Sequence, residues 1–284
     1  MWSLVVEPFL EFEFLRRAAL EAVILGFGFS VVGLVLVTRR LSLIGDTLSH
    51  AMLPGVVLAF TLFGPHLLAL FFGGWITGFF LLVLAWVLFR SRRVEADAAL
   101  ALFAVFSVSV GILIASRTRT TTEILHLLFG NILAVDRTLL VLSALVGGVT
   151  WILFLWHYRA VFVALVDPAF FQQMKRPSYL FILGLCALFS ANLTVGFASL
   201  GAMMTVGLLI VPALVGRSLG KSPLQMALIA FVFSSVVSVS GILLSFHLSV
   251  PAGPSIVCLA CAGLALIQIF RFRGFSRSPE VEPS

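Results

Sequence analysis

The stretch AALEAVILGFGFSVVGLVLVT, residues 18–38, decides the fold class. It carries one ionisable side chain, Glu21, and is long enough to cross the roughly 30 Å hydrocarbon core of a bilayer as an α-helix. Similar apolar runs recur along the chain, at roughly 43–63, 66–89, 98–116, 138–156, 178–193, 198–216, 225–245 and 254–270. The sequence therefore predicts an all-α fold, a polytopic membrane helical bundle of about nine transmembrane helices.

The composition supports a membrane protein and excludes a soluble domain. Of the 284 residues, 61% are hydrophobic and 11% are charged, and the mean hydropathy is +1.17. A soluble chain of this length needs far more charge to cover its surface, and the short alternating strands of an outer-membrane barrel are not visible. We expect one transmembrane domain, residues 1–274, followed by a disordered tail, residues 275–284.

The 18 Lys and Arg residues divide unequally between the two sets of connections that nine crossings create. One set holds only Arg16, Arg17, Arg117, Arg119 and Arg137, and the other set holds all the rest. Because cytoplasmic loops are enriched in Lys and Arg, we expect the N-terminus outside and the C-terminus inside. The net charge of +6 then reflects membrane topology, and no nucleic-acid partner is expected.

The segment GDTLSHAMLPG, residues 45–55, places polar residues beside and inside the second apolar run. Asp46 and His50 are four residues apart, so their side chains share one face of a helix. A carboxylate and an imidazole form a mixed oxygen and nitrogen ligand set that suits Zn²⁺, Mn²⁺ or Fe²⁺. The spacing also fits a structural hydrogen bond between the two side chains, or a proton relay. Two ligands alone do not complete a metal site.

Pro54 predicts a kink next to this pair. Proline has no N–H, so the carbonyl of His50 loses its helical partner, and Gly55 loosens the turn further. We therefore expect a kinked helix with an unpaired carbonyl beside the two candidate ligands.

Two further segments do not fit simple crossings. The run TTEILHLLFGNILAVD, residues 121–136, is too short to span and too apolar for a free loop, so we expect a re-entrant or surface helix. The run RAVFVALVDPAFFQQMKRP, residues 159–177, predicts a short helix with Asp167 as its N-cap and Pro168 at its first position. A short helix on the expected cytoplasmic side is a natural contact for a soluble partner.

The remaining ionisable residues in or near the spans are weaker candidates for metal ligands. Glu123 and His126 lie three residues apart in the 121–136 segment, where a solvated helix face is the more ordinary interpretation. Glu21 is expected to pair with Arg16, Arg17 or a neighbouring helix. Three further histidines fall at the ends of predicted spans: His66, His157 and His247.

No segment of the sequence predicts catalysis by this chain. The run GRSLGKS, residues 216–222, resembles a phosphate-binding P-loop, but it has three residues between its glycines where that motif needs four. It also follows a predicted membrane helix, whereas the P-loop follows a strand. The zinc-protease motif HExxH and the nucleophile elbow GxSxG are absent from the sequence. The sequence therefore predicts no ATPase machinery within this chain.

The residues around Asp46 and His50 are similar to those of a known family. The run RRLSLIGDTLSHAMLPG, residues 39–55, resembles the signature of bacterial ABC-transporter permeases for divalent metals, the zinc, manganese and iron uptake type. Further resemblances follow in the family's order: LFGNILAV at 128–135, LGA at 200–202, LLIVPA at 208–213 and PAGPSIV at 251–257. Together they span nearly the whole chain.

This resemblance implies the permease subunit of an ATP-driven importer in the cell inner membrane, with Asp46 and His50 lining the path of a Zn, Mn or Fe ion. It implies a transport subunit rather than an enzyme, with no permanently bound cofactor. It implies a homodimer or another pairing of permeases, two cytoplasmic ATPase subunits that use the ATP, and an extracytoplasmic binding protein that delivers the metal. The family's coupling helix, which contacts the ATPase, falls on about residues 160–177 and contains Asp167, Pro168, Phe171, Lys175 and Arg176.

The sequence departs from the family pattern in three places. Asn131 stands where the family usually has Asp, Asp97-Ala98-Ala99 has alanine where a glycine is usual, and no glycine follows Asp167. We therefore assign no metal ligand to Asn131.

Two other functions stay open on the residues alone. One is a proton-coupled secondary metal transporter in which Asp46 and His50 relay protons, as intramembrane Asp and His residues do in some transporters. The other is an intramembrane metalloenzyme in which the same pair helps to activate a water molecule. Copurification with an ATPase subunit distinguishes the importer from both.

Overall fold

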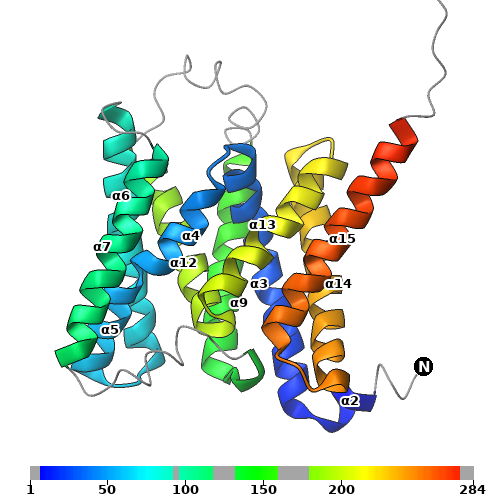
Figure 1. Ribbon diagram of the computed structural model, residues 1–284, viewed down its shortest axis with the longest axis horizontal. Coiled ribbons are helices and arrows are strands. Elements are labelled where there is room, and N and C mark those ends of the chain that lie inside the picture. Colours follow the sequence, from blue (N-terminus) through cyan, green and yellow to red (C-terminus); the bar gives the residue numbers. More distant parts are fainter. Residues whose placement is uncertain (1–6, 92–95, 118–131, 159–178, 276–284) are drawn as a thin grey trace, which may run out of the picture.

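The computed structural model describes residues 7–91, 96–117, 132–158 and 179–275 (Figure 1). Its regular elements there are helices: α2 (Glu7–Glu11), α3 (Glu13–Thr38), α4 (Ser42–Ala51), α5 (Leu53–Phe63), α6 (Leu67–Ser91), α7 (Ala96–Arg117), the 3₁₀ turn η1 (Ile132–Ala134), α9 (Arg137–Trp156), α12 (Tyr179–Leu200), α13 (Ala202–Leu219), α14 (Pro223–Leu248) and α15 (Ala252–Phe275).

The predicted fold class is confirmed, because the described residues form an all-α bundle of helices that run between two ends (Figure 1). Eight candidate spans in this part of the chain are long and apolar enough to cross a membrane, with α4 and α5 counted together as one. The shorter apolar helix α13 corresponds to the seventh of the nine predicted segments.

Helix α3 lies at the centre of the bundle and is buried along most of its length. It packs against α9, α13 and α14, and small residues allow the close approach. A Cβ atom at Gly33 would lie 2.1 Å from the backbone oxygen of Leu209 on α13, and one at Gly28 would lie 3.2 Å from Gly147 Cα on α9. Glycine at these positions lets the backbones of neighbouring helices approach closely.

The predicted boundary between the sixth and seventh segments is wrong by several residues. The sequence places it between residues 193 and 198, whereas α12 continues to Leu200 and the break is at Gly201. Gly201 has φ 82°, a conformation that glycine adopts without steric cost. Gly196, inside the predicted gap, is helical and lies close to Phe29 and Thr205, where a larger side chain would clash.

The end of the bundle at which α3 and α13 finish holds basic side chains. Arg217 Nη1 donates a hydrogen bond to the carbonyl of Val37 at 3.0 Å, which joins the last turns of these two helices. Arg271 on α15 donates to the carbonyl of Ser218 at the same end. By the distribution of Lys and Arg, this upper end in Figure 1 is the one that we expect to be cytoplasmic.

Two predicted segments fall wholly or largely outside the described residues. The expected coupling helix, with Asp167, Pro168, Phe171, Lys175 and Arg176, lies outside them completely, as do Glu123 and His126. Of the 121–136 segment, the structure describes only the turn η1 and the residues that lead into α9. Asp136 is there the N-cap of α9, and its carboxylate accepts a hydrogen bond from the N–H of Leu139 at 2.8 Å.

Candidate metal-binding site

Helix α4 is a ten-residue helix with one buried face and one exposed face. Leu48 has no exposed surface, and Ile44, Gly45, Thr47 and Ser49 are also buried. The helix packs against α7 and α13, and a Cβ atom at Gly45 would lie 3.4 Å from Cδ2 of Leu209 on α13. This packing fixes which face of α4 is turned away from the rest of the chain.

Asp46 and His50 both lie on the outward part of α4. The Nε2 atom of His50 is 4.0 Å from Oδ1 of Asp46, and the side chains are 33% and 63% exposed, respectively. The predicted i, i+4 pairing on one helix face is therefore present in the structure. A separation of 4.0 Å is longer than a hydrogen bond, so the two groups do not satisfy each other.

The helix that carries this pair is interrupted at Met52, two residues before Pro54. Helix α4 ends at Ala51, and α5 starts at Leu53 with Pro54 in its first turn. The expected break is thus found. The N–H of Met52 donates to the carbonyl of Leu48 at 3.1 Å and completes the last turn of α4, and the unpaired carbonyl of His50 stays a prediction.

Helix α5 is held firmly against α6 beyond the break. A Cβ atom at Gly55 would lie 2.1 Å from the carbonyl oxygen of Gly73, and one at Gly73 would lie 2.4 Å from that of Gly55. Gly74 and Gly78 continue the small-residue surface of α6 toward Thr194 and Ser190 of α12. Helix α7 packs against both halves of the broken helix, while α5 also packs on α6 and α4 also packs on α13.

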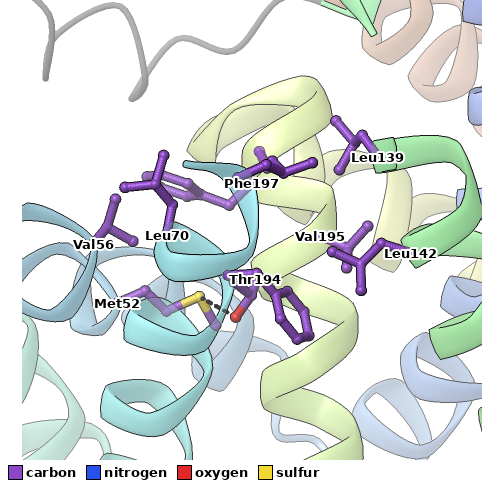
Figure 2. Close-up of a pocket in the computed structure, with 11 residues that line it drawn as sticks. Met52, Val56, Leu70, Leu139, Leu142, Thr194, Val195 and Phe197 are labelled. Atoms are coloured by element: carbon purple, nitrogen blue, oxygen red, sulfur yellow. Dashed lines mark hydrogen bonds between the residues drawn. The ribbon is translucent and has the colours of Figure 1, made fainter. Parts of the chain in front are cut away.

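A cavity of about 80 Å³ lies behind the break, between α5, α6, α9 and α12 (Figure 2). Its lining is apolar apart from the hydroxyl of Thr194, which donates to Met52 Sδ at 3.3 Å. Val56, Leu70, Leu142 and Val195 form part of its wall. An apolar lining without carboxylate or imidazole groups does not suit a divalent cation, so this cavity is distinct from the Asp46 and His50 pair.

No third ligand joins the pair within the part of the chain that the structure describes. No group of three or more His, Cys, Asp or Glu side chains there is close enough to hold a metal ion. His247 is exposed at the end of α14, and its Nδ1 lies 2.9 Å from the carbonyl of Leu243 in its own helix. His66 is exposed before the start of α6.

Glu21 is buried at the centre of the bundle and pairs with no arginine among the residues that the structure describes. Ser143 on α9 and Ser199 on α12 each donate a hydrogen bond to its Oε1, at 2.6 and 2.5 Å, while Arg17 instead pairs with Glu13. Of the expected partners, the neighbouring helices are the ones found. The sequence shows Glu21 as an ionisable residue within a predicted span. Its serine partners lie more than 100 residues away along the chain, and no sequence pattern connects them with Glu21.

Comparisons with known proteins find similar sequences over most of the chain. The sequence profile described as "ABC 3 transport family" matches residues 11–271. The chelated iron transport system membrane protein YfeD of Yersinia pestis is 30% identical over 270 residues, which cover 95% of this chain and 89% of that protein. The manganese import system permease protein ScaB of Streptococcus gordonii is 30% identical over 261 residues, covering 92% of each chain.

A solved structure shows the same fold. It is titled PsaBC from Streptococcus pneumoniae in complex with Fab, and its matching chain superimposes with a TM-score of 0.82 at 27% identity. The superposition covers 94% of this chain and 95% of that chain.

Proposed function

The chain belongs to the ABC 3 transport family, and we propose that it is the membrane permease subunit of an ATP-driven importer of divalent metal ions. In this role the chain provides the path across the membrane, and a separate ATPase provides the energy. The observation that carries the proposal is the exposed pair of Asp46 and His50 on α4, inside a membrane-spanning segment.

The exposure of Asp46 is the physical argument for a function. A charged side chain within a membrane span is costly, up to about 2.5–3.5 kcal/mol at the bilayer centre on insertion scales, so such residues face a water-filled passage or a protein partner rather than lipid. Asp46 is the fifth residue of the candidate span Ser42–Phe63. The carboxylate is 63% exposed and is not hydrogen-bonded to His50. The described residues contain no group of three or more His, Cys, Asp or Glu side chains that could complete a metal site with it.

A second copy of the chain is the simplest source of the missing ligands. In a dimer with two-fold symmetry the same surface patch meets itself, so two α4 helices that face each other bring together two carboxylates and two imidazoles. Four ligands of this kind form a complete oxygen and nitrogen set for a divalent ion. The pair on one chain is then half of a site, which fits its two ligands and its exposure.

Manganese and iron are the ions that the relatives' names support. The two relatives described above are named for chelated iron and for manganese, and carboxylate with imidazole suits both ions. Zinc fits the same ligand chemistry but has no support from those names. The ion is the cargo of the protein, and a transport site must bind it weakly enough to release it on the other side.

The remaining partners follow from the family. Two cytoplasmic ATPase subunits are proposed to contact residues 160–177, and an extracytoplasmic protein is proposed to deliver the metal at the opposite end of the bundle. The basic side chains where α3 and α13 end, such as Arg217, mark the end that faces the ATPase in this proposal.

Uptake of Mn²⁺ or Fe²⁺ into proteoliposomes tests the proposal. The permease is reconstituted with its ATPase and its binding protein, and uptake is measured with and without ATP. Asp46→Ala and His50→Ala are expected to assemble normally and to lose ATP-dependent uptake. His247→Ala, which removes an exposed imidazole at a helix end, is the matched control and is expected to transport like the unmodified protein.

Two results would contradict the proposal. Normal uptake by both α4 variants would show that the ion does not pass Asp46 and His50. Uptake that needs a pH gradient but no ATP would instead identify a proton-coupled secondary transporter.

A further inference from the structure

The carboxyl group of Glu21 has two oxygens in different situations. Oε1 accepts hydrogen bonds from Ser143 on α9 and Ser199 on α12, and so joins three helices at one atom. Oε2 is fully buried and has no hydrogen-bond partner. A buried polar network that is only partly satisfied costs stability, because a group that loses its water must find a partner to recover that loss.

The two serines do not depend on Glu21. The hydroxyl of Ser143 also lies 2.8 Å from the carbonyl of Leu139, and that of Ser199 lies 3.1 Å from the carbonyl of Val195. Serine in a helix commonly donates to the carbonyl four residues earlier. An apolar side chain in place of Glu21 would therefore leave neither hydroxyl without an acceptor. If the carboxyl of Glu21 is removed, both serine hydroxyls still have a carbonyl acceptor in their own helix, and no buried polar atom of this group is left without a hydrogen bond.

One hydrogen-bond partner of Glu21 lies close to a break between two helices. Ser199 lies two residues before Gly201, where α12 ends and α13 begins. Leu200 and Ala202 on either side of the break are buried, so this corner is enclosed by protein. Backbone that leaves the helix at membrane depth is tolerated only in such surroundings or beside water. The corner between α12 and α13 is therefore a defined point at which the bundle can bend.

Helix α13 connects this corner to the helix that carries the candidate ligands. Helix α13 packs against both α3 and α4. A Cβ atom at Gly33 on α3 would lie 2.1 Å from the backbone oxygen of Leu209, and one at Gly45 on α4 would lie 3.4 Å from Cδ2 of Leu209. Gly45 immediately precedes Asp46. A displacement of α13 at the corner would therefore reach the face of α4 on which Asp46 and His50 lie.

We propose that Glu21 is a positioning residue for transport. Its buried carboxyl makes it easier for the corner between α12 and α13 to separate from α3. In the packed arrangement its carboxyl is only half satisfied. When α9 and α12 move away from α3, water reaches Oε2 and completes its hydrogen bonds. Compared with an apolar side chain, the carboxyl thus favours the separated arrangement. The inference rests on the proposed function as a permease.

The variant Glu21→Leu separates this role from a structural one. It removes the unpartnered oxygen and keeps the volume apolar, so the thermal unfolding midpoint in detergent is expected to rise by about 2–4 °C. Turnover of metal uptake is expected to fall by about three- to thirtyfold, with little change in the metal concentration at half-maximal rate. A residue that only held the fold together would lower the unfolding midpoint when replaced.

Two further comparisons make the test specific. Glu21→Gln retains an acceptor for both serines and stays polar. The turnover of metal uptake by this variant is therefore expected to stay within about twofold of that of the unmodified protein, a smaller change than the one expected for Glu21→Leu. Ser199→Ala is expected to lower the unfolding midpoint when Glu21 is present, because it removes one hydrogen-bond donor from the buried carboxyl. In the Glu21→Leu background there is no carboxyl to lose a donor, so Ser199→Ala is expected to have little effect on the midpoint. Ser109→Ala on α7 is the control, since this exposed hydroxyl donates only within its own helix.

The proposal is overturned if Glu21→Leu lowers the unfolding midpoint, or if it transports at the unmodified rate. It is also overturned if Glu21→Gln is as slow as Glu21→Leu, because charge rather than polarity would then be required. The stability measurements need no transport. If the unmodified complex shows no ATP-dependent uptake, the permease proposal fails on that result, while the unfolding midpoints still decide whether the carboxyl costs stability.

Discussion

Oδ1 of Asp46 and Nε2 of His50 lie 4.0 Å apart on the exposed side of α4. This separation excludes a direct hydrogen bond between them, which was one interpretation of their spacing. Each side chain retains free lone pairs, and the helix that carries both side chains packs against α7 and α13. The backbone of α4 thus places the two side chains on the same face, and no hydrogen bond between them fixes their conformations.

Loss of either ligand is expected to weaken metal binding. Asp46→Ala and His50→Ala should each raise the dissociation constant for Mn²⁺ by more than about tenfold, since even the loss of an outer partner of a ligand costs about 10–100-fold. Titration calorimetry with the purified permease measures this. Unchanged affinity in both variants would remove α4 from the site, and His247→Ala again provides the control.

The contact between Gly55 and Gly73 is expected to tolerate no side chain. Gly55→Ala places a Cβ atom about 2 Å from the Gly73 carbonyl oxygen, and overpacking of this kind costs about 1–3 kcal/mol. The free energy of unfolding should fall by that amount. Gly148→Ala on α9, where no atom lies within 4 Å of the new Cβ, is the matched control and should be neutral or slightly stabilising. Equal effects at the two positions would contradict the close packing of α5 on α6.

Met52 is expected to support the break between α4 and α5. It has no exposed surface and lines the cavity shown in Figure 2. Met52→Ala would enlarge that cavity, and buried large-to-small changes cost about 2–5 kcal/mol. Thermal unfolding in detergent measures the loss, with Leu62→Ala as control because Leu62 is largely exposed. A change no larger than that of the control would show that the break does not depend on packing around Met52.

Asp136 is expected to stabilise α9 as its N-cap. Its side chain accepts a hydrogen bond from the N–H of Leu139 at 2.8 Å, and replacing such a cap by alanine costs about 1 kcal/mol. Asp136→Asn keeps a capping oxygen and should retain most of the stability. If Asp136→Asn and Asp136→Ala lower the stability equally, the stabilising effect of Asp136 comes from its charge and not from the capping hydrogen bond.

The bundle was predictable from the sequence because its signal is local. Each apolar run shows the length of a span, and Asp46, His50 and Pro54 lie within one short segment, so their common face and the nearby break follow from helix geometry. The break itself is at Met52, since a proline is accommodated in the first turn of a new helix more readily than inside an old one.

The remainder depended on contacts between distant parts of the chain. Glu21 meets Ser143 and Ser199, which lie more than 100 residues away, and no spacing rule connects them. The position of the break at Gly201 rather than near residue 196 depends on Phe29 and Thr205 packing against Gly196. Such tertiary contacts override the local pattern, so the second helix corner was misplaced although its existence was predicted.

The number of Mn²⁺ ions bound per permease chain tests the central claim most directly. If Asp46 and His50 are half of a site that two copies complete, the purified permease binds one ion for every two chains, and Asp46→Ala abolishes this binding. Binding of one ion per chain, or one ion for two chains that survives Asp46→Ala, would contradict the account.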